Sequence, residues 1–399
     1  MQIQTTPYLD VAQLRADTPG CQDNLFMNSA GASLMPQPVV AAMMEYLQQE
    51  TQVGGYEVER LRMGQIGRLY DETAQLLNTQ LHNIGFAYSA TDAYFRILSA
   101  IPFQEGDTIL TTSNDYVSNQ LAFLSMQQRL GIRLLRINDL PNGDLDLTHA
   151  EELIRKHHPV LVAITHIPTN SGLVLPAEEM GKLCRQYDVW YLLDVAQSVG
   201  QLPLDVNRLQ ADFLVATGRK FLRGPRNTGF LYVSDKALES GLAPLYIDRR
   251  AANWTGPDSY TLQTSARRFE PQEISLLSVG LAEAVRYTNQ VGLEAIVQQN
   301  QQLMHQLRMG LEQIDGLVLL DRGTQQSNIL TFHTIRQSVA ALETALRRER
   351  VVFTIQYSNS AVIDFQRKRV DWLIRLSPHY FNTLDEINEV VDLLGQIIH

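Results

Sequence analysis

Short apolar runs alternate with amphipathic stretches through the middle of this chain. Between residues 84 and 233, runs of four to six mostly apolar residues are separated by segments in which apolar residues recur at helical spacing. We expect strands at residues 84–88, 108–112, 133–137, 160–165, 189–193, 213–216 and 229–233, with helices at 117–129, 147–157 and 177–187. Strands that alternate with helices are joined by crossover connections. The pattern therefore predicts an α/β fold with a mainly parallel, seven-stranded sheet that helices cover on both faces.

The pattern changes at both ends of the chain. The N-terminal part, to about residue 78, is mostly helical and includes a helix at 38–49 that starts with a proline. After the last strand we expect, in order, a loop-rich stretch at 243–271, helices at 272–290 and 294–314, strands at 317–320 and 327–332, a helix at 337–348, strands at 351–356 and 373–376, and a terminal helix from Leu384. This order predicts a large domain of residues 1–255, N-terminal segment included, and a small C-terminal α+β domain of residues 256–399.

Composition and charge narrow the possible partners. The 399 residues include 33 Lys and Arg against 43 Asp and Glu, a net charge of −10. An acidic surface repels phosphate backbones, so we expect no nucleic-acid partner. No stretch reaches the roughly 20 apolar residues of a membrane helix, and the N-terminus lacks the pattern of a signal peptide. The two cysteines, Cys21 and Cys184, form neither a disulfide framework nor a CxxC pair. We therefore expect a cytoplasmic protein with no membrane partner and no metal site.

Polar residues follow several of the expected strands, where ligands of open α/β sheets bind. The first strand leads into Tyr-Ser-Ala-Thr-Asp, so Ala90, Thr91 and Asp92 open a helix. Backbone N–H groups and a hydroxyl at that position suit an anion such as phosphate. An ordinary Ser/Thr helix cap explains the same residues, so this motif alone does not identify a site.

The fifth strand is followed by Asp194, and Gln197 comes three residues later. A carboxylate at a strand end can keep a pyridine nitrogen protonated, which makes pyridoxal phosphate an electron sink. Gln197 is then placed to bond the ring hydroxyl. Taken by itself, Asp194 is explained equally well as the cap of the next turn.

The sixth strand is followed by Thr217-Gly-Arg219-Lys220, and Lys220 lies 26 positions after Asp194. Lysine is the side chain that forms Schiff bases with carbonyl groups. Thr217 and Arg219 supply a hydroxyl and a positive charge for a phosphate. A single lysine in a loop is usually solvated, but the joint spacing of these residues predicts pyridoxal phosphate, with its imine on Lys220 and its ring nitrogen on Asp194.

At these residues the sequence resembles the class V aminotransferase and cysteine desulfurase family. The blocks DVAQSVGQLPLDV and ADFLVATGRKFLRGPRNTGFLYV are similar to its signature motifs. The segments FMNSAGASLMPQPV, GGYE, ARRFE and RLSPHYFNTLDEI are similar to the hercynylcysteine sulfoxide lyase-like branch, which lacks a persulfide cysteine. The resemblance implies the fold type I of pyridoxal-phosphate enzymes and a homodimer. It also implies an amino acid as the small-molecule substrate.

The resemblance also implies a role for each matching residue. Lys220 and Asp194 would be the catalytic pair, and the cofactor-binding set would be Ala90, Thr91, Asp92, Tyr116, Asn170, Gln197, Thr217 and Arg219. Within that set, Gln197 and Asn170 would face the ring hydroxyl. Arg375 would grip the substrate carboxylate, assisted by Asn28, and Arg268 would reach the partner's site. Two positions depart from the family, because Arg219 and Tyr116 stand where histidines are common.

The sequence leaves the reaction open among several classes. Desulfurases carry a nucleophilic cysteine before the carboxylate-binding arginine, but residues 351–375 contain none. We therefore favour β-elimination from a cysteine-derived substrate, a C–S lyase reaction in which Lys220 accepts the α-proton. Transamination and epimerisation are the alternatives on the same site. A non-catalytic binding protein is a third possibility, which the joint presence of Lys220, Asp194 and Arg375 disfavours.

Overall fold

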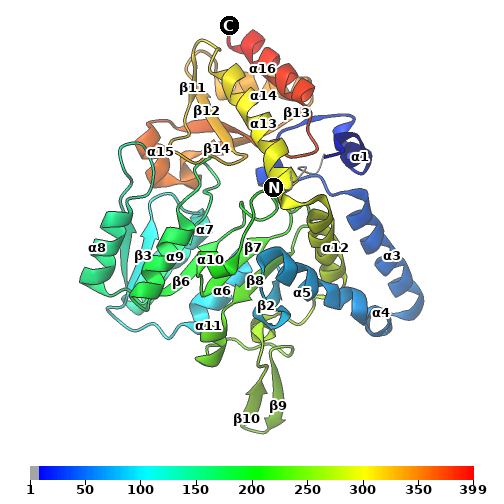
Figure 1. Ribbon diagram of the computed structural model, residues 1–399, viewed down its shortest axis with the longest axis vertical. Coiled ribbons are helices and arrows are strands. Elements are labelled where there is room, and N and C mark those ends of the chain that lie inside the picture. Colours follow the sequence, from blue (N-terminus) through cyan, green and yellow to red (C-terminus); the bar gives the residue numbers. More distant parts are fainter. Residues whose placement is uncertain (1–8) are drawn as a thin grey trace, which may run out of the picture.

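A seven-stranded sheet forms the centre of the larger part of the molecule (Figure 1). The computed structural model describes residues 9–399. In chain order the strands are β2 (Ile84–Ala87), β3 (Thr108–Thr112), β4 (Arg133–Ile137), β5 (Leu161–Thr165), β6 (Trp190–Asp194), β7 (Phe213–Thr217) and β8 (Gly229–Val233). They lie in the order β2-β8-β7-β6-β5-β3-β4, and β8 alone runs in the direction opposite to the other six. The predicted mainly parallel sheet is thus confirmed.

Alternate residues of each strand enter two separate cores. On β5, Val162 and Ile164 pack in one core, whereas Leu161 and Ala163 pack in the other. The first core is closed by α5 (Met63–Leu77), α8 (Leu147–His157), α9 (Ala177–Gln186), α10 (Val206–Leu209) and α12 (Ser275–Val291). The second is closed by α6 (Ala90–Ala100), α7 (Val117–Leu130) and α11 (Asp235–Glu239). Burial on both faces explains why these strands are continuous apolar runs in the sequence.

A smaller α+β unit lies beside the carboxyl ends of the large sheet (Figure 1). Its antiparallel sheet has the order β11-β12-β15-β14. The strands are β11 (Leu317–Leu319), β12 (Leu330–Thr334), β14 (Thr354–Tyr357) and β15 (Trp372–Leu376), and the helices are α13 (Leu293–Leu311), α14 (Val339–Arg348), α15 (Val362–Lys368) and α16 (Leu384–Ile398). The N-terminal region contributes α1 (Val11–Ala16), β1 (Leu25–Phe26), α2 (Ser29–Ala32), α3 (Gln37–Val53) and α4 (Gly55–Leu61). Strand β1 pairs with β13 (Val351–Val352), which joins the N-terminal segment to the small unit.

The boundary expected after residue 255 falls inside a β-hairpin. The stretch expected to be loop-rich contains β9 (Ala252–Gly256) and β10 (Ser259–Leu262), which pair with each other. Helix α12 follows and packs along α5 and α3 of the large unit, whereas α13 packs along α16 of the small one. We therefore propose that the small domain starts between α12 and α13 and also receives β1 from the N-terminal segment.

Among residues 9–399, the structure contains no helix long and apolar enough to cross a membrane.

Candidate active site

The carboxyl ends of the sheet strands and the start of α6 surround a small cavity. Of the residues predicted for the site, those lining it are Ala90, Thr91, Tyr116, Asp194, Gln197, Thr217, Arg219 and Lys220. Asp194 and Thr217 are the last residues of β6 and β7. Because parallel strands end at the same edge of a sheet, residues far apart in the sequence meet here.

Lys220 is the buried amine of this cavity. Its side chain is inside the protein, 6% exposed, and its Nζ lies 5.8 Å from the centre of the Tyr116 ring. Burial, together with the positive charges of Arg219 and Arg375, lowers the pKa of Lys220 to about 7, although the charge of Asp194 opposes this shift. A neutral amine is therefore well populated at neutral pH, as a nucleophile or proton acceptor requires.

Asp194 is a buried carboxylate whose two oxygens are both held. Oδ1 accepts a hydrogen bond from the Ala196 N–H at 2.9 Å, and Oδ2 accepts one from Asn119 Nδ2 at 3.2 Å. Burial raises the pKa of Asp194, while these two bonds and the charge of Lys220 oppose the rise. A carboxylate in such a place is stabilised by a cation against it, which a protonated ring nitrogen supplies.

Arg375 brings a buried guanidinium from the small sheet to the edge of the site. Its Nη1 donates to the Thr169 carbonyl and hydroxyl, both at 2.8 Å. Its Nη2 lies 3.4 Å from Asn28 Oδ1 and 3.3 Å from Thr354 Oγ1, so Asn28 stands beside it as predicted. Burial and the charge of Arg219 lower its pKa to about 10, so it stays cationic at neutral pH. A fork of this kind suits a carboxylate.

Three predicted residues take positions other than those expected. The backbone N–H of Asp92 donates to Ser89 Oγ, which caps α6, and its carboxylate pairs with Arg96, so Asp92 does not line the cavity. Arg268 is buried and donates to the carbonyls of Leu238, Leu242 and Thr264, so its guanidinium is used within its own chain.

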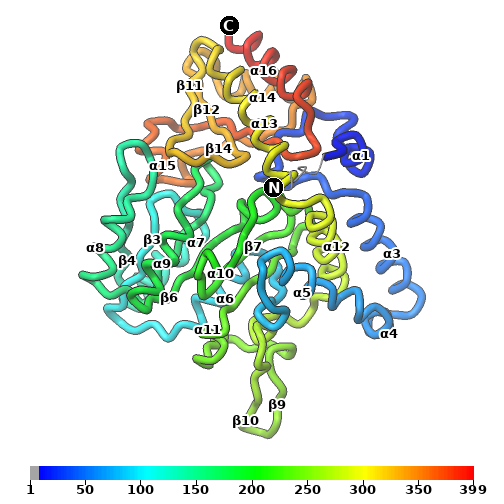
Figure 2. The backbone as a smooth tube through the Cα atoms, viewed as in Figure 1, coloured from blue at the N-terminus to red at the C-terminus, as the bar shows by residue number. Residues whose placement is uncertain are grey.

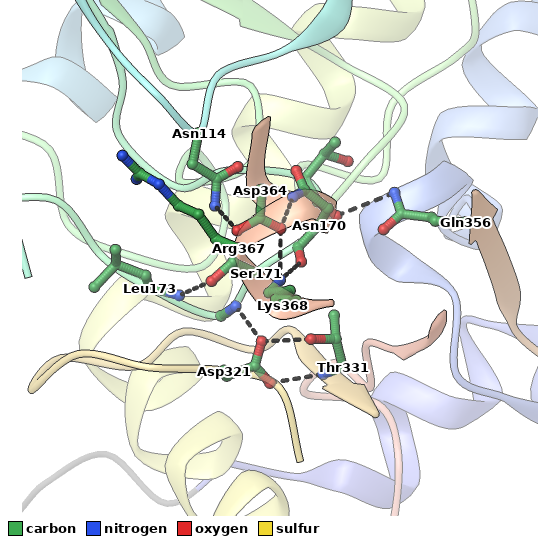
Figure 3. Close-up of polar contacts among 12 residues, drawn as sticks. Asn114, Asn170, Ser171, Leu173, Asp321, Thr331, Gln356, Asp364, Arg367 and Lys368 are labelled. Carbon is green, nitrogen blue, oxygen red and sulfur yellow. Dashed lines mark hydrogen bonds and ion pairs between the residues drawn. The ribbon is translucent and has the colours of Figure 1, made fainter. Parts of the chain in front are cut away.

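Asn170 is the third of these residues. Its Nδ2 donates to Asp364 Oδ2 at 2.5 Å, and its backbone carbonyl accepts from Lys368 Nζ at 2.7 Å (Figure 3). It is not among the residues that line the cavity; Thr169, one residue earlier, is. The structure therefore turns the Asn170 side chain toward the small domain, where Asp364 of α15 accepts its hydrogen bond and Lys368 of the same helix bonds the Asn170 backbone carbonyl.

The small domain also holds the neighbours of Asn170 in the loop at residues 169–172. Asp321 accepts hydrogen bonds from the Gly172 N–H and from the N–H and hydroxyl of Thr331 (Figure 3). Gln356 Nε2 donates to the Thr169 carbonyl at 3.4 Å. Sequence reasoning missed these partners, because only the fold brings them to the loop. The one local signal was the spacing of Asp364 and Lys368, which form an i,i+4 ion pair.

The remaining polar groups of the cavity are suited to an aromatic, phosphorylated ligand. Gln197 Nε2 donates to the Ala30 carbonyl and the Thr169 hydroxyl. Its Oε1 is buried and has no partner among the described residues. A buried orphan acceptor indicates a missing donor, and a ring hydroxyl is one. Thr91 at the start of α6, together with Arg219, offers donors and positive charge for a phosphate.

Comparison with known proteins gives the same picture. The family model described as aminotransferase class-V matches residues 25–390. The chain belongs to the class-V aminotransferase family. It is thus a pyridoxal-phosphate-dependent enzyme, as the sequence predicted. Its place in the hercynylcysteine sulfoxide lyase-like branch stays a prediction.

The relatives of this class-V enzyme match it over nearly its whole length. A probable cysteine desulfurase from Pyrococcus abyssi is 26% identical, covering 96% of this chain and 97% of its own. An apo cysteine desulfurase structure from Thermococcus onnurineus has a TM-score of 0.89 at 23% identity, covering 98% and 99% of the two chains. The cystine C–S lyase C-DES in complex with cysteine persulfide has a TM-score of 0.83 at 24% identity, covering 95% and 99%. These structures establish the shared fold.

The lowered pKa of Lys220 makes loading of the cofactor pH-dependent. Because that pKa is about 7, the reactive neutral amine rises from about one tenth of the protein at pH 6 to about nine tenths at pH 8. We expect the rate at which apoprotein incorporates pyridoxal phosphate to rise with pH over this range and then level off. Stopped-flow absorbance measures this rate. N-acetyl-lysine, with an ordinary amine, is the control, and a protein midpoint near that of the control would contradict the expectation.

Proposed function

We propose that this class-V enzyme cleaves a C–S bond by β-elimination from a cysteine-derived amino acid. The observation that carries the proposal is a buried lysine and a buried arginine at one site, with no thiol there. Cys21 and Cys184 are both buried and line no part of the cavity. Burial raises the pKa of Cys21 to about 11 and that of Cys184 further, so neither supplies a thiolate nucleophile. By their names, the relatives act on cysteine and cystine.

The residues of the site then divide the work. Arg375, with Asn28 beside it, binds the α-carboxylate, and the neutral Lys220 amine accepts the α-proton. Asp194 holds the ring nitrogen, and Thr91, Thr217 and Arg219 hold the phosphate. When bound, pyridoxal phosphate supplies the electron sink for the charge left at the α-carbon. The Tyr116 ring supports the face of the cofactor, as an aromatic side chain in that position can.

The resemblance of four segments to the hercynylcysteine sulfoxide lyase-like branch supports a finer proposal. We propose that the substrate is a thioether or sulfoxide of cysteine rather than free cysteine. The stretch that precedes Arg375 supports this choice, because residues 351–375 contain no cysteine, whereas desulfurases carry their nucleophilic cysteine before that arginine.

The products distinguish the candidate reactions. We expect holoenzyme incubated with cysteine conjugates and their sulfoxides to release equal amounts of pyruvate and ammonia, measured by coupled dehydrogenase assays. Alanine with a persulfide product would instead show desulfuration. Solvent deuterium at the α-carbon without pyruvate would show epimerisation. Conversion of the bound cofactor to its amine form would show transamination. Any of the last three results, without elimination, would overturn the proposed reaction.

We further propose that the enzyme works in the cytoplasm as a homodimer. The β9–β10 hairpin projects from the body of the molecule (Figure 2), and its Trp254 and Tyr260 are 82% and 57% exposed. Exposed aromatic clusters mark interaction surfaces. Light scattering should give twice the mass of one chain, and the double change Trp254→Ser, Tyr260→Ser should shift the protein toward monomer. Ile335→Ser, at another exposed apolar residue, is the matched control. A monomeric parent protein would contradict this.

A further inference from the structure

The second oxygen of Asp194 is held by a side chain that the family motifs do not include. Asn119, on the first turn of α7, is 1% exposed, and its Nδ2 lies 3.2 Å from Asp194 Oδ2. The same nitrogen lies 3.1 Å from Oδ1 of a second buried carboxylate, Asp115. One amide NH2 group therefore bridges two carboxylates, using one hydrogen for each.

Asp115 is itself fixed from several sides. Its Oδ1 accepts from the Thr165 hydroxyl and from the Tyr116 N–H at 2.7 Å, and its Oδ2 accepts from Gln120 Nε2 at 3.0 Å and from Thr111 Oγ1 at 3.3 Å. Thr165 is the last residue of β5. Asp115 is thus anchored to two sheet strands and to the start of α7, and cannot turn away from Asn119 without losing these bonds.

This arrangement leaves Asn119 one stable orientation. Both of its neighbours are carboxylate oxygens, which only accept hydrogen bonds when ionised. If the amide were flipped, its carbonyl oxygen would face both acceptors and three negative or partly negative groups would meet in a buried place. Asp115 therefore fixes the direction in which Asn119 donates toward Asp194.

We propose that Asn119, held in place by Asp115, is a positioning residue that keeps Asp194 ionised and aligned with the ring nitrogen of pyridoxal phosphate. The proposal rests on the proposed pairing of Asp194 with that nitrogen. A buried carboxylate next to a protonated ring nitrogen can take the proton for itself. A hydrogen bond donated to the ionised form of Asp194 opposes this transfer, so the proton stays on the ring, where electron withdrawal requires it.

The charges around Asp194 leave this task to its two hydrogen bonds, and Asn119 donates the one that comes from a side chain. Asp115 and Asp194 repel each other, which favours protonation of one of them. The nearby phenol, Tyr94 on α6, is buried, and its pKa is raised by burial and by these two carboxylates, so it adds no positive charge. Lys220 is the one group whose positive charge opposes protonation of Asp194. Because burial lowers the pKa of Lys220 to about 7, and its amine is the group that joins the cofactor, that charge is not a dependable counterweight.

The test follows the pH at which the visible absorbance band of the holoenzyme changes. A protonated ring nitrogen disfavours a second proton on the nitrogen that joins the cofactor to Lys220. When the ring nitrogen loses its proton, the nitrogen that joins the cofactor to Lys220 therefore holds its own proton up to a higher pH. The pH midpoint of the absorbance change rises accordingly. Asn119→Leu keeps the shape and removes the donor, and Asn119→Ala serves if the leucine variant fails to fold. We expect either to raise the midpoint by about one pH unit, the effect of about 1.4 kcal/mol between the two protonation states.

Two further variants make the outcome decisive. Asn83→Leu is the matched control, because Asn83 is also a buried asparagine that donates to a carboxylate, Asp235, but lies at the amino end of β2. Its midpoint should be unchanged. Asp194→Asn should raise the midpoint more than either Asn119 variant. If only Asp194→Asn shifts the midpoint, the role of Asn119 is overturned. If Asp194→Asn shifts nothing, the proposed pairing of Asp194 with the ring fails and the inference falls with it.

Discussion

Lys220→Ala is expected to reduce turnover by at least about 10³-fold, because one change removes both the amine that joins the cofactor and the base that accepts the α-proton. Cofactor binding should survive in part, since Thr91, Arg219 and Asp194 remain. Initial rates of pyruvate release measure the loss. Borohydride reduction of the parent holoenzyme, followed by peptide mass spectrometry, should find the reduced cofactor on the peptide that contains Lys220.

Lys182→Ala is the matched control for this change, because Lys182 is an exposed lysine on α9 with the same side chain. It should keep the parent rate and the parent labelling pattern. Two results would remove Lys220 from the centre of the mechanism. One is a Lys220→Ala protein that retains most of its activity, and the other is a cofactor label on a different lysine peptide.

Much of the fold could be predicted, because a sheet that is buried on both faces has strands rich in apolar residues. Most strands of the large sheet are apolar runs, and β4, which lies at the edge and contains Arg133 and Arg136, is the clearest exception. The expected and observed bounds of the seven strands differ by one residue at most. The eight predicted residues that line the cavity follow from the same fact. A ligand site at the carboxyl edge of a parallel sheet draws on residues that come directly after the strands.

What the sequence could not provide are contacts made across long distances in the chain. Asn170 looked like a cofactor ligand because of its neighbours in the sequence, but Asp364, 194 positions later, takes its side chain. The β9–β10 hairpin was missed because its residues are mostly exposed, so no apolar pattern marks its strands. Asn119 had a usable signal: it lies in the first turn of α7, four residues after Asp115, which comes just before that helix.

Arg375→Lys is expected to lower kcat/KM by about 10²-fold, mainly through a higher KM. Lysine keeps the positive charge but loses the planar fork that binds a carboxylate through two parallel hydrogen bonds. Arg375→Leu should cost more, about 10³-fold, because a hydrogen-bonded charge pair with the substrate is lost altogether. Steady-state kinetics with the best cysteine conjugate measures both. Arg348→Lys, at an exposed arginine paired with Glu349, is the control and should behave as the parent does.

A loss of activity alone would not separate carboxylate binding from damage to the loop, because Arg375 also donates to both oxygens of Thr169. Binding of a matched pair of ligands separates them. The conjugate and its decarboxylated amine differ only in the carboxylate that Arg375 is proposed to grip. The parent protein should prefer the amino acid, and Arg375→Leu should lose that preference while its affinity for the amine changes little. Equal weakening for both ligands would mean that Arg375 supports the loop through Thr169 and that another group binds the substrate carboxylate.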